Sequence, residues 1–325
     1  MRVLDGIGAL PDREREQGCV ATVGVFDGVH LGHLAVLRKV IERADALQVR
    51  PVMVTFAGHP KSVLLGTAPP TITSLEHRLL LFERAGIDCT LVLPFNDQLR
   101  KLPADDFVRQ ILLEGLGLRE LVFGFDSKFG KDRGGNPESL RPYARQLGFA
   151  ITEVPPTRQA GRAVSSTFIR EAVQVGDLPR ASALLGRPCS LLGTVVPGAQ
   201  RGRTLGFPTA NLRLHHELRP PYGVYAAQLL RRGELLPAVV NIGKRPTFAA
   251  EDIQVEAHLL DFQGNLYGEV LEVFLLKRLR PEIAFANELA LKEQIQIDIN
   301  ECRQVLSDPP APTAAEFLSG SYCAD

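Results

Sequence analysis

Apolar and polar residues alternate with two different periods over the first 180 positions. Short runs that are apolar almost throughout are separated by longer segments with apolar residues every three to four positions. The predicted strands are Val20–Phe26, Pro51–Phe56, Cys89–Phe95, Glu120–Phe125 and Phe149–Val154, and the predicted helices are Leu34–Leu47, Ser74–Ala85, Pro103–Leu113 and Pro137–Leu147. Apolar strands that alternate with helices are typical of a parallel sheet covered on both faces. We therefore predict an α/β domain over residues 1–180.

The pattern changes after Leu185, where strand-like runs are separated by glycine and proline. These runs are Ser190–Val196, Gly223–Leu230, Leu235–Gly243, Gln254–Leu260 and Glu269–Leu276. Gln254–Leu260 alternates polar and apolar residues, which suits an antiparallel strand with one wet face. Apolar residues recur at helical spacing from Leu291 to Leu306 and predict a closing helix over 284–306. We expect a small β-barrel or sandwich over 188–308, an inter-domain junction at 177–188 and a loose tail over 309–325.

Composition narrows the classes of function. The 325 residues carry 37 Lys and Arg against 37 Asp and Glu, and this balance disfavours a nucleic-acid-binding protein. No run of 18 apolar residues suggests a membrane span, and Met1–Pro11 does not have the pattern of a signal peptide. The five cysteines are scattered without a C-x-x-C pair, which disfavours disulfides and a zinc site. A cytoplasmic location is expected.

The segment GVFDGVHLGH, Gly24–His33, joins the first predicted strand of this domain to its first helix. Gly24 and Gly32 would let the backbone approach a nucleotide, and a helix N-terminus attracts phosphate. His30 and His33 carry imidazoles that can donate hydrogen bonds to phosphate oxygens. Two other interpretations stay open, which are a tight turn with glycines at positive φ and a metal pair without a clear third ligand.

A second candidate phosphate-binding segment is SSTFIR, Ser165–Arg170, at the predicted start of a helix. Its hydroxyls could equally be helix caps. The segment GFDSKFGKD, Gly124–Asp132, resembles a P-loop but has five residues between its glycines rather than four. Asp132 also stands where a magnesium-binding Ser or Thr is needed, so a P-loop is rejected.

The second half contains RGRTLGFPTANL, Arg201–Leu212, in which Thr209 and Asn211 alternate with Ala210. Both side chains should face the same side of an extended segment, because successive residues point to opposite sides. A hydroxyl and an amide oxygen are ligands suited to Mg²⁺ with bound phosphates. Glu256 is the candidate carboxylate to orient an acceptor hydroxyl, although a lone glutamate on a wet strand face is also ordinary surface.

These motifs together resemble one family. GVFDGVHLGH resembles the HxGH signature of nucleotidyltransferases, in the form typical of bacterial bifunctional riboflavin kinase/FAD synthetases. SSTFIR and TFAGHPKSVL, Thr55–Leu64, match that family in order, and the PTAN of GFPTANL with the strand around Glu256 resembles riboflavin kinases. The resemblance runs from about Gly18 to Leu306.

The resemblance implies a fold and two reactions. The fold is an HxGH nucleotidyltransferase-like α/β domain followed by a small six-stranded barrel with a terminal helix. The barrel would phosphorylate riboflavin to FMN with ATP and Mg²⁺, and the first domain would adenylylate FMN to FAD and release pyrophosphate. The implied partners are small molecules, namely riboflavin, FMN and ATP, without nucleic acid or membrane.

The resemblance also implies roles for individual residues. The catalytic residues would be His30, His33, Arg170 and Glu256, and Thr209 and Asn211 would hold Mg²⁺. The nucleotide-binding residues would be Gly24, Phe26, Asp27, Gly32, Ser165, Ser166, Thr167, Gly198, Gly202 and Pro208. The flavin-binding residues would be His59, Asp126, Phe207 and Tyr225. One position departs from the family pattern, because Ser127 replaces an aromatic residue.

Three alternatives remain open from the sequence. The first is a nucleotidyltransferase for another acceptor with the barrel as an accessory, which the PTAN motif and Glu256 disfavour. The second is a flavin- or nucleotide-binding regulatory protein without activity. The presence of His30, His33, Thr209, Asn211 and Glu256 disfavours it, although Ser127 keeps it open for the first domain. The third is a nucleic-acid-binding barrel, which the zero net charge disfavours.

Overall fold

The computed structural model describes residues 1–6, 12–58, 69–198, 201–216, 218–246 and 251–319. The chain forms two compact units that change over at Ser165 and Ser166, with the short segment Ile72–Ser74 grouped with the second unit. The first unit thus ends earlier than the expected domain limit at residue 180. Among the described residues, no helix is long and apolar enough to cross a membrane.

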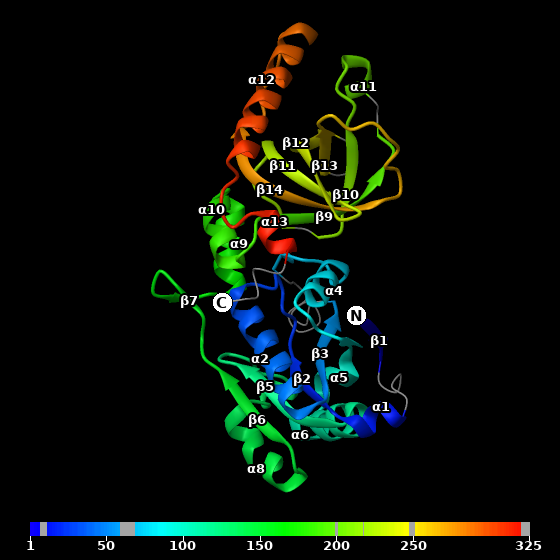
Figure 1. Cartoon of the computed structure of the whole chain (residues 1–325), viewed down its shortest axis with the longest axis vertical. Helices are drawn as coiled ribbons and strands as arrows, with labels where there is room; N and C mark the ends of the chain where they lie inside the picture. The colour runs from blue at the N-terminus through cyan, green and yellow to red at the C-terminus, as the bar shows by residue number, and fades with distance from the viewer. Residues whose placement is uncertain (7–11, 59–68, 199–200, 217, 247–250, 320–325) are drawn as a thin grey trace. The chain divides into compact units, whose positions relative to one another are not determined.

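The first unit is built on a six-stranded sheet (Figure 1). Its elements are β1 (Arg2–Asp5), α1 (Asp12–Gln17), β2 (Cys19–Val23), α2 (Leu31–Leu47), β3 (Arg50–Ala57), α4 (Leu75–Arg84), β4 (Cys89–Pro94), α5 (Asp97–Lys101), α6 (Ala104–Phe107), the π-helix η1 (Val108–Leu113), α7 (Glu114–Leu116), β5 (Leu118–Gly124), the 3₁₀-helix η2 (Lys131–Arg133), α8 (Pro137–Leu147), β6 (Ala150–Val154) and the hairpin of β7 (Arg158–Gln159) and β8 (Arg162–Ala163). The strand order is β1-β4-β3-β2-β5-β6 and every pair is parallel. The predicted parallel α/β domain is confirmed.

Helices cover both faces of this sheet, as its apolar strands predict. Cys19, Ala21 and Val23 of β2 share a buried cluster with residues of α6 and η1, among them Phe107 and Ile111. Successive strand residues point to opposite faces, so the other residues of β2 face α2, which packs on β2, β3 and β5. A strand buried on both sides needs no polar alternation, which explains the continuous apolar run in the sequence.

An ion pair between the half-buried Arg43 and the buried Glu120 fixes α2 to the strands. Arg43 of α2 donates hydrogen bonds at 2.9–3.0 Å to both carboxylate oxygens of Glu120 in β5, and the hydroxyl of Thr152 in β6 donates to Glu120 at 2.7 Å. Burial raises the pKa of the Glu120 carboxyl, but these hydrogen bonds and the charge of Arg43 outweigh it and leave the pKa below its usual value. The carboxylate therefore stays ionised although only 1% of the residue is exposed.

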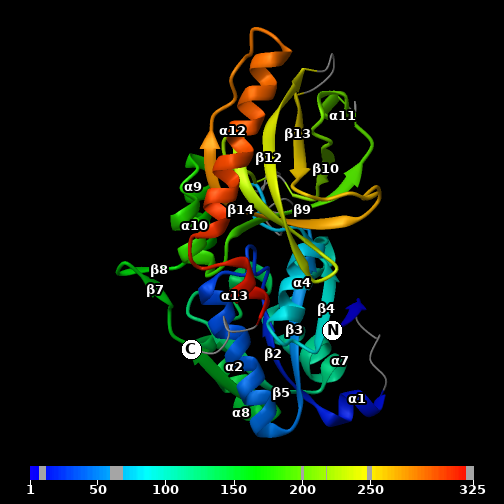
Figure 2. The same ribbon diagram turned by 45° about the horizontal axis from the view of Figure 1, so that its top comes forward.

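The second unit is a closed barrel with helices on its outside (Figure 2). Its elements are α9 (Ser166–Val175), α10 (Leu178–Leu185), β9 (Cys189–Val196), α11 (Arg201–Leu205), β10 (Ala210–Leu214), β11 (Gly223–Arg231), β12 (Glu234–Pro246), β13 (Glu251–Leu259), β14 (Val270–Arg280), α12 (Glu288–Ser307) and α13 (Ala314–Leu318). The six strands close in the order β10-β13-β12-β11-β14-β9, all antiparallel. The expected six-stranded barrel is confirmed.

The terminal helix α12 lies against the barrel wall, where Ile299 and Cys302 share a buried cluster with Val224, Ala226 and Val239. The helix starts four residues later than predicted, because the side chain of Asn287 caps it by accepting from the Ala290 N–H at 2.9 Å.

The predicted loose tail is corrected for residues 314–318, which form α13. Thr313 and Glu316 make a reciprocal capping box at its start. Phe317 is buried beside Phe274, with ring centroids 6.3 Å apart, and the guanidinium of Arg187 lies 5.5 Å from the Phe317 ring centroid. An aromatic anchor and a cation–π contact therefore hold this helix on the second unit. Residues 320–325 lie outside the described residues.

Candidate active site

The first unit has a natural ligand position where its strand order reverses. The chain adds β3 and β4 on one side of β2 and places β5 and β6 on the other. Ligands of open α/β sheets bind beyond the carboxyl ends of the strands at such a reversal. The segment 24–30 follows β2 and the segment 125–130 follows β5. Parts of two motifs from the sequence, GVFDGVHLGH and GFDSKFG, therefore lie at the carboxyl ends of the strands where a ligand is expected.

The turn after β2 has a strained backbone. Phe26, Gly28 and Val29 have φ values of 53°, 84° and 39°. A positive φ costs little at glycine, but it is unusual for phenylalanine and more so for the β-branched valine. Such strain persists only where the surrounding structure fixes the backbone, and it concentrates at functional sites.

The two predicted histidines stand together at the start of α2. His30 is the N-cap, and its Nδ1 accepts a hydrogen bond from the backbone N–H of His33 at 3.3 Å. The two rings stack with centroids 3.6 Å apart, and Phe26 stacks on the other side of His33 at 4.4 Å. Since Nδ1 of His30 is an acceptor, the neutral ring carries its proton on Nε2. His30 therefore combines a helix cap with an imidazole donor at a helix N-terminus.

Close packing leaves no room for a side chain at Gly24 and little room at Gly32. A Cβ on Gly24 would lie 2.7 Å from the ring of Phe26, and one on Gly32 would lie 3.2 Å from the ring of His30. A Cβ on Gly32 would also lie 3.8 Å from the carbonyl oxygen of Val164. The chain just before Ser165 therefore lies close to the start of α2. Asp27, also in this turn, is buried.

A buried arginine that the sequence reasoning missed holds the ends of β2 and β3. Arg78 of α4 donates to the carbonyl of Val25 at 2.6 Å, to the Thr55 hydroxyl at 3.3 Å and to the carbonyl of Phe56 at 3.3 Å. Burial lowers the pKa of the Arg78 guanidinium, and the charges of Asp27 and Glu76 act in the opposite direction. Arg78 thereby ties the strained turn to the strand beside it.

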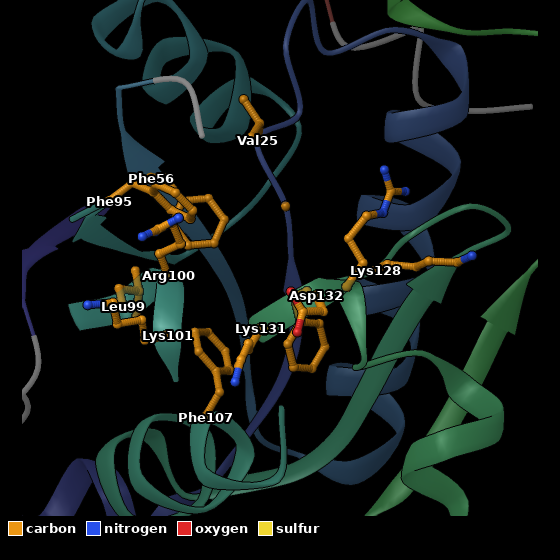
Figure 3. Close-up of a pocket in the computed structure, with 14 residues that line it drawn as sticks. Val25, Phe56, Phe95, Leu99, Arg100, Lys101, Phe107, Lys128, Lys131 and Asp132 are labelled. Carbon is orange, nitrogen blue, oxygen red and sulfur yellow. The ribbon is translucent and has the colours of Figure 1, made fainter. Parts of the chain in front are cut away.

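A pocket of about 530 Å³ opens beside the same strand ends (Figure 3). It is lined by Gly24, Val25, Phe56, Phe95, Leu99, Arg100, Lys101, Phe107, Lys128, Phe129, Gly130, Lys131, Asp132 and Arg133. Figure 3 shows Phe56 and Phe95 close together on one side of it, and their rings meet edge to face at 5.5 Å. Phe107 and Phe129 also contact each other, with centroids 5.0 Å apart. Aromatic walls with a rim rich in Lys and Arg suit a flat, anionic ligand.

Asp126, an expected flavin contact, is not among the described residues that line the pocket. The Asp126 side chain is 71% exposed, and its Oδ1 lies 4.0 Å from the guanidinium of Arg133. Ser127, the departure from the family pattern, uses its hydroxyl to accept from the Gly124 N–H at 3.1 Å. His59 lies outside the described residues.

The predicted SSTFIR motif falls where the two units change over. Ser165 is the last residue of the first unit, and Ser166 opens α9. Thr167 is exposed, and Arg170 lies in the same helix. The segment is thus a helix start, as predicted.

In the second unit, three strands align the polar residues that the sequence singled out. Glu256 of β13 pairs in register with Asn211 of β10 on one side and with Asn241 of β12 on the other. The amide nitrogen Nε2 of Gln254 donates to Asn211 Oδ1 at 2.8 Å and to Glu256 Oε1 at 2.7 Å. Asn211 and Glu256, which are 45 positions apart in the chain, are therefore bridged by one side chain.

A pocket of about 740 Å³ lies between this face of the barrel and α12. It is lined by Gly202, Leu205, Phe207, Thr209, Val224, Val239, Asn241, Lys244, Gln254, Glu256, His258, Arg280, Glu282, Ile283, Phe285, Leu291, Ile295 and Asp298. The predicted Gly202, Phe207, Thr209 and Glu256 come together here. One wall is fixed by Arg280, which donates to both carboxylate oxygens of the buried Asp298 at 2.8–3.1 Å.

A second pocket, of about 460 Å³, also touches β10. It is lined by Val195, Pro208, Thr209, Ala210, Leu259, Phe262, Gln263, Gly264, Asn265, Leu266 and Tyr267. Thr209 lines both pockets, so this residue stands where ligands in the two would meet. Gly198 packs against the same segment, because a Cβ there would lie 2.0 Å from Asn211 Nδ2.

The expectation that Tyr225 contacts the flavin is corrected by the structure. It is completely buried, and its hydroxyl donates to the carbonyl of Pro221. Its neighbours Val224 and Ala226 face α12, so Tyr225 points the other way, into the barrel. Burial raises the pKa of the Tyr225 phenol to about 12. Val224 lines the pocket in its place.

Comparisons with known proteins agree with this arrangement. The family model described as FAD synthetase matches residues 12–168, and the one described as riboflavin kinase matches residues 185–306. A bifunctional riboflavin kinase/FMN adenylyltransferase of Pseudomonas fluorescens is 39% identical over 96% of this chain and 99% of the relative. A bifunctional riboflavin kinase/FMN adenylyltransferase of Haemophilus influenzae is 38% identical over 88% of this chain and 94% of the relative. The chain belongs to the bifunctional riboflavin kinase/FMN adenylyltransferase family.

Solved structures include a protein of Streptococcus pneumoniae described as a macrolide-efflux protein. It is 30% identical, with a TM-score of 0.80 over 93% of this chain and 99% of that one. The match covers 93% of this chain and therefore includes residues of both units.

The family assignment confirms the expected fold class and the two expected activities, with the FAD synthetase part first and the riboflavin kinase part second. The roles of individual residues stay predictions. Three features escaped the sequence reasoning, namely Arg78, Gln254 and the wall formed by Phe95, Phe107 and Phe129. Gln254 alone had a detectable signal, since it lies two positions before Glu256 on an alternating strand.

Proposed function

We propose that the barrel unit transfers the γ-phosphoryl group of ATP to riboflavin and that the sheet unit transfers the AMP group of a second ATP to FMN. One observation carries the kinase assignment: two pockets adjoin β10, and Thr209 lines both. A kinase needs two substrates whose reacting atoms meet at one point held by positioning groups.

The larger pocket is the proposed riboflavin site. Its apolar side chains include Phe207, Val224 and Ile295, which suit the flat flavin ring, and its polar side holds Glu256. Glu256 would accept the proton of the terminal ribityl hydroxyl as its oxygen bonds to the γ-phosphorus of ATP, the bond from that phosphorus to the bridging oxygen breaks, and ADP leaves. The smaller pocket, with Phe262 and Tyr267, would take the adenine end of ATP.

The donor set beside this meeting point fits Mg²⁺. Thr209 and Asn211 present a hydroxyl and an amide oxygen, which are hard ligands, and Glu256 is in register with Asn211. When bound with ATP, the ion would neutralise phosphate charge. The protein's own part is to hold these oxygens in place and to keep the acceptor hydroxyl at Glu256.

The sheet unit is the proposed adenylyltransferase. A phosphate oxygen of FMN would bond to the α-phosphorus of ATP as the bond from that phosphorus to the bridging oxygen breaks and pyrophosphate leaves. His30 and His33 at the start of α2 would donate hydrogen bonds to the phosphates, and the helix N-terminus favours the same negative charge. The motif assigns Arg170 the same electrostatic role, and Ser165, Ser166 and Thr167 that of phosphate ligands.

The aromatic pocket of this unit is the proposed FMN site. Phe56, Phe95, Phe107 and Phe129 would pack on the flavin ring. Among the described residues that line the pocket, the cations are Arg100, Lys101, Lys128, Lys131 and Arg133, and the carboxylate is that of Asp132. This excess of positive charge favours an anionic flavin nucleotide over neutral riboflavin. The chain would thereby separate its two flavin substrates by charge.

We also propose a cytoplasmic location. Cys19, Cys89, Cys189 and Cys302 are buried free thiols in the part of the chain that the structure describes, and reduced cysteines are typical of the cytosol.

The test is incubation of the protein with riboflavin, ATP and Mg²⁺, with FMN and FAD followed by chromatography. We expect FMN first and FAD after it. If no flavin nucleotide forms from riboflavin, the kinase proposal is wrong, and if supplied FMN is not converted to FAD, the adenylyltransferase proposal is wrong.

A further inference from the structure

Strand β13 turns three alternate side chains, Gln254, Glu256 and His258, toward the larger barrel pocket. The proposed function uses only the middle one. The two flanking residues both bond to the Pro208–Asn211 segment: Gln254 bonds to Asn211, and Nδ1 of His258 donates to the carbonyl of Pro208 at 2.8 Å. The PTAN segment is thus held against β13 at both ends.

The contact of Gln254 is specific in a way that ordinary packing does not require. Its Nε2 carries two hydrogens, and the group donates to Asn211 Oδ1 and to Glu256 Oε1 at 2.8 and 2.7 Å. One amide group therefore joins the proposed metal ligand to the proposed base.

This contact also determines which end of the Asn211 amide faces Gln254. The oxygen and nitrogen of an asparagine amide have nearly the same shape, so packing alone does not distinguish the two orientations. Gln254 requires an acceptor and selects the oxygen, while Asn211 Nδ2 lies toward Gly198. The opposite orientation would direct an N–H group to the place where a cation ligand is needed.

We infer that Gln254 is a positioning residue for phosphoryl transfer, whose amide holds the oxygen of Asn211 and the carboxylate of Glu256 in one fixed arrangement. The inference rests on the proposed function of the barrel site. Gln254 acts through its two partners, and its contribution should therefore affect the chemical step and leave riboflavin binding unchanged.

The test compares Gln254→Met and Gln254→Glu with the matched control Gln228→Met. Gln228 is a half-buried glutamine on β11 of the same barrel, paired with Pro237 and Phe274. Methionine keeps the length of the side chain and removes the donor, whereas glutamate keeps the shape and puts a second carboxylate beside Glu256.

We expect Gln254→Met to lower the kinase kcat by about 10- to 100-fold, the usual cost of losing a group that orients a metal ligand. Riboflavin affinity, measured by quenching of flavin fluorescence, should stay within about twofold of the wild type, and FAD formation from supplied FMN should be unchanged. Gln254→Glu should be the more severe variant, because it adds charge repulsion while preserving shape. The control should behave as wild type.

Other results would overturn the inference. A fall of kcat by less than about fivefold in Gln254→Met would show that the bridge is not needed. A milder effect of Gln254→Glu than of Gln254→Met, or a parallel loss of riboflavin affinity, would assign Gln254 a role in shape or packing. Should Gln254→Met fail to fold, as judged by circular dichroism and by loss of FAD formation, Gln254→Glu against Gln228→Glu decides by the same split between kcat and affinity.

A double-variant cycle separates this inference from the proposed function. In an Asn211→Ala background the Gln254→Met change should lower kcat by a smaller factor than it does in the wild type, because one of the two partners of Gln254 is already gone. If Asn211→Ala and Glu256→Gln leave the kinase intact, the proposed site itself is wrong. If those two abolish activity and Gln254→Met does not, only the role of Gln254 is wrong.

Discussion

Replacing Arg78 by methionine should disable the adenylyltransferase half and spare the kinase half. Arg78 is 5% exposed, and its guanidinium donates to the carbonyls of Val25 and Phe56 and to the Thr55 hydroxyl. A hydrogen bond from a charged group contributes about 1.5–3 kcal/mol, and a buried acceptor left without a donor costs a similar amount. Removing the buried cation recovers part of this through relief of its desolvation. A net destabilisation of about 3 kcal/mol follows for the sheet unit.

In Arg78→Met, adenylyltransferase activity should fall by more than the destabilisation of the sheet unit alone would cause. The Val25 carbonyl precedes Phe26, the first of the residues held at positive φ, so freeing it lets the strained turn relax. His30 and His33 lie at the end of this turn, and a displacement of about 1 Å at a reacting centre costs about 100-fold in rate. Arg78→Lys should fall between methionine and wild type, because an ammonium group cannot reproduce the fork that spans both carbonyls.

The assay measures FAD formation from supplied FMN and, in the same preparation, FMN formation from riboflavin. Arg84→Met is the control, since Arg84 is a half-buried arginine in the last turn of the same helix. Hydrogen exchange of the β2 and β3 amides follows the stability of the sheet unit separately from that of the barrel. If Arg78→Met kept its adenylyltransferase kcat/KM within about threefold of the wild type, the turn would not depend on this arginine.

Four further changes test the two sites and the packing behind them. Glu256→Gln should lower riboflavin phosphorylation by about 100-fold or more and leave FAD formation from FMN unchanged. His33→Ala should lower FAD formation from FMN by about 100- to 1,000-fold and leave riboflavin phosphorylation unchanged. Loss of both activities in either folded variant would contradict two separate sites. Gly198→Ala would place a Cβ 2.0 Å from Asn211 Nδ2, so the kinase kcat should fall at least about tenfold with adenylyl transfer unchanged. Glu120→Gln should destabilise the sheet unit at pH 7. The pKa of Glu120 is lowered in the folded protein, so its ion pair stabilises above the unfolded carboxyl pKa of about 4.3 and that contribution is lost as pH falls through the folded value. Denaturation midpoints of the two proteins should therefore converge in acid, and a constant difference down to pH 3 would contradict the assignment.

The sequence predicted the sheet well because its strands are buried on both faces. A buried strand must be apolar throughout, and that run is visible without knowing its neighbours. The ends of elements were less accurate: the predicted strand Val20–Phe26 stops at Val23, where the strained turn begins. Helix α13 was missed because prolines precede it, although Thr313 and Glu316 have the spacing of a capping box.

The catalytic motifs could be found in the sequence because each is contiguous, whereas the pocket walls could not. Phe56, Phe95, Phe107 and Phe129 come from separate segments of the chain and meet only when the sheet and its covering helices have formed. Tyr225 illustrates a different limit. Strand alternation shows that Tyr225 and Val224 face opposite ways, but only closure of the barrel and the position of α12 decide which of them meets a ligand.

Ser127 shows how a departure from a motif should be judged against the structure. In sequence, the serine replaces an aromatic residue of the family pattern and keeps an inactive flavin site open as an alternative. In the structure, the Ser127 hydroxyl accepts from the Gly124 N–H and closes the turn after β5, while Phe107 and Phe129 supply aromatic rings to the neighbouring pocket. Phe129 stacks on Phe123 at 5.8 Å, so the wall is supported from β5 itself. The change at position 127 therefore alters the turn without removing the aromatic wall, and it gives no physical reason to expect the adenylyltransferase half to be inactive.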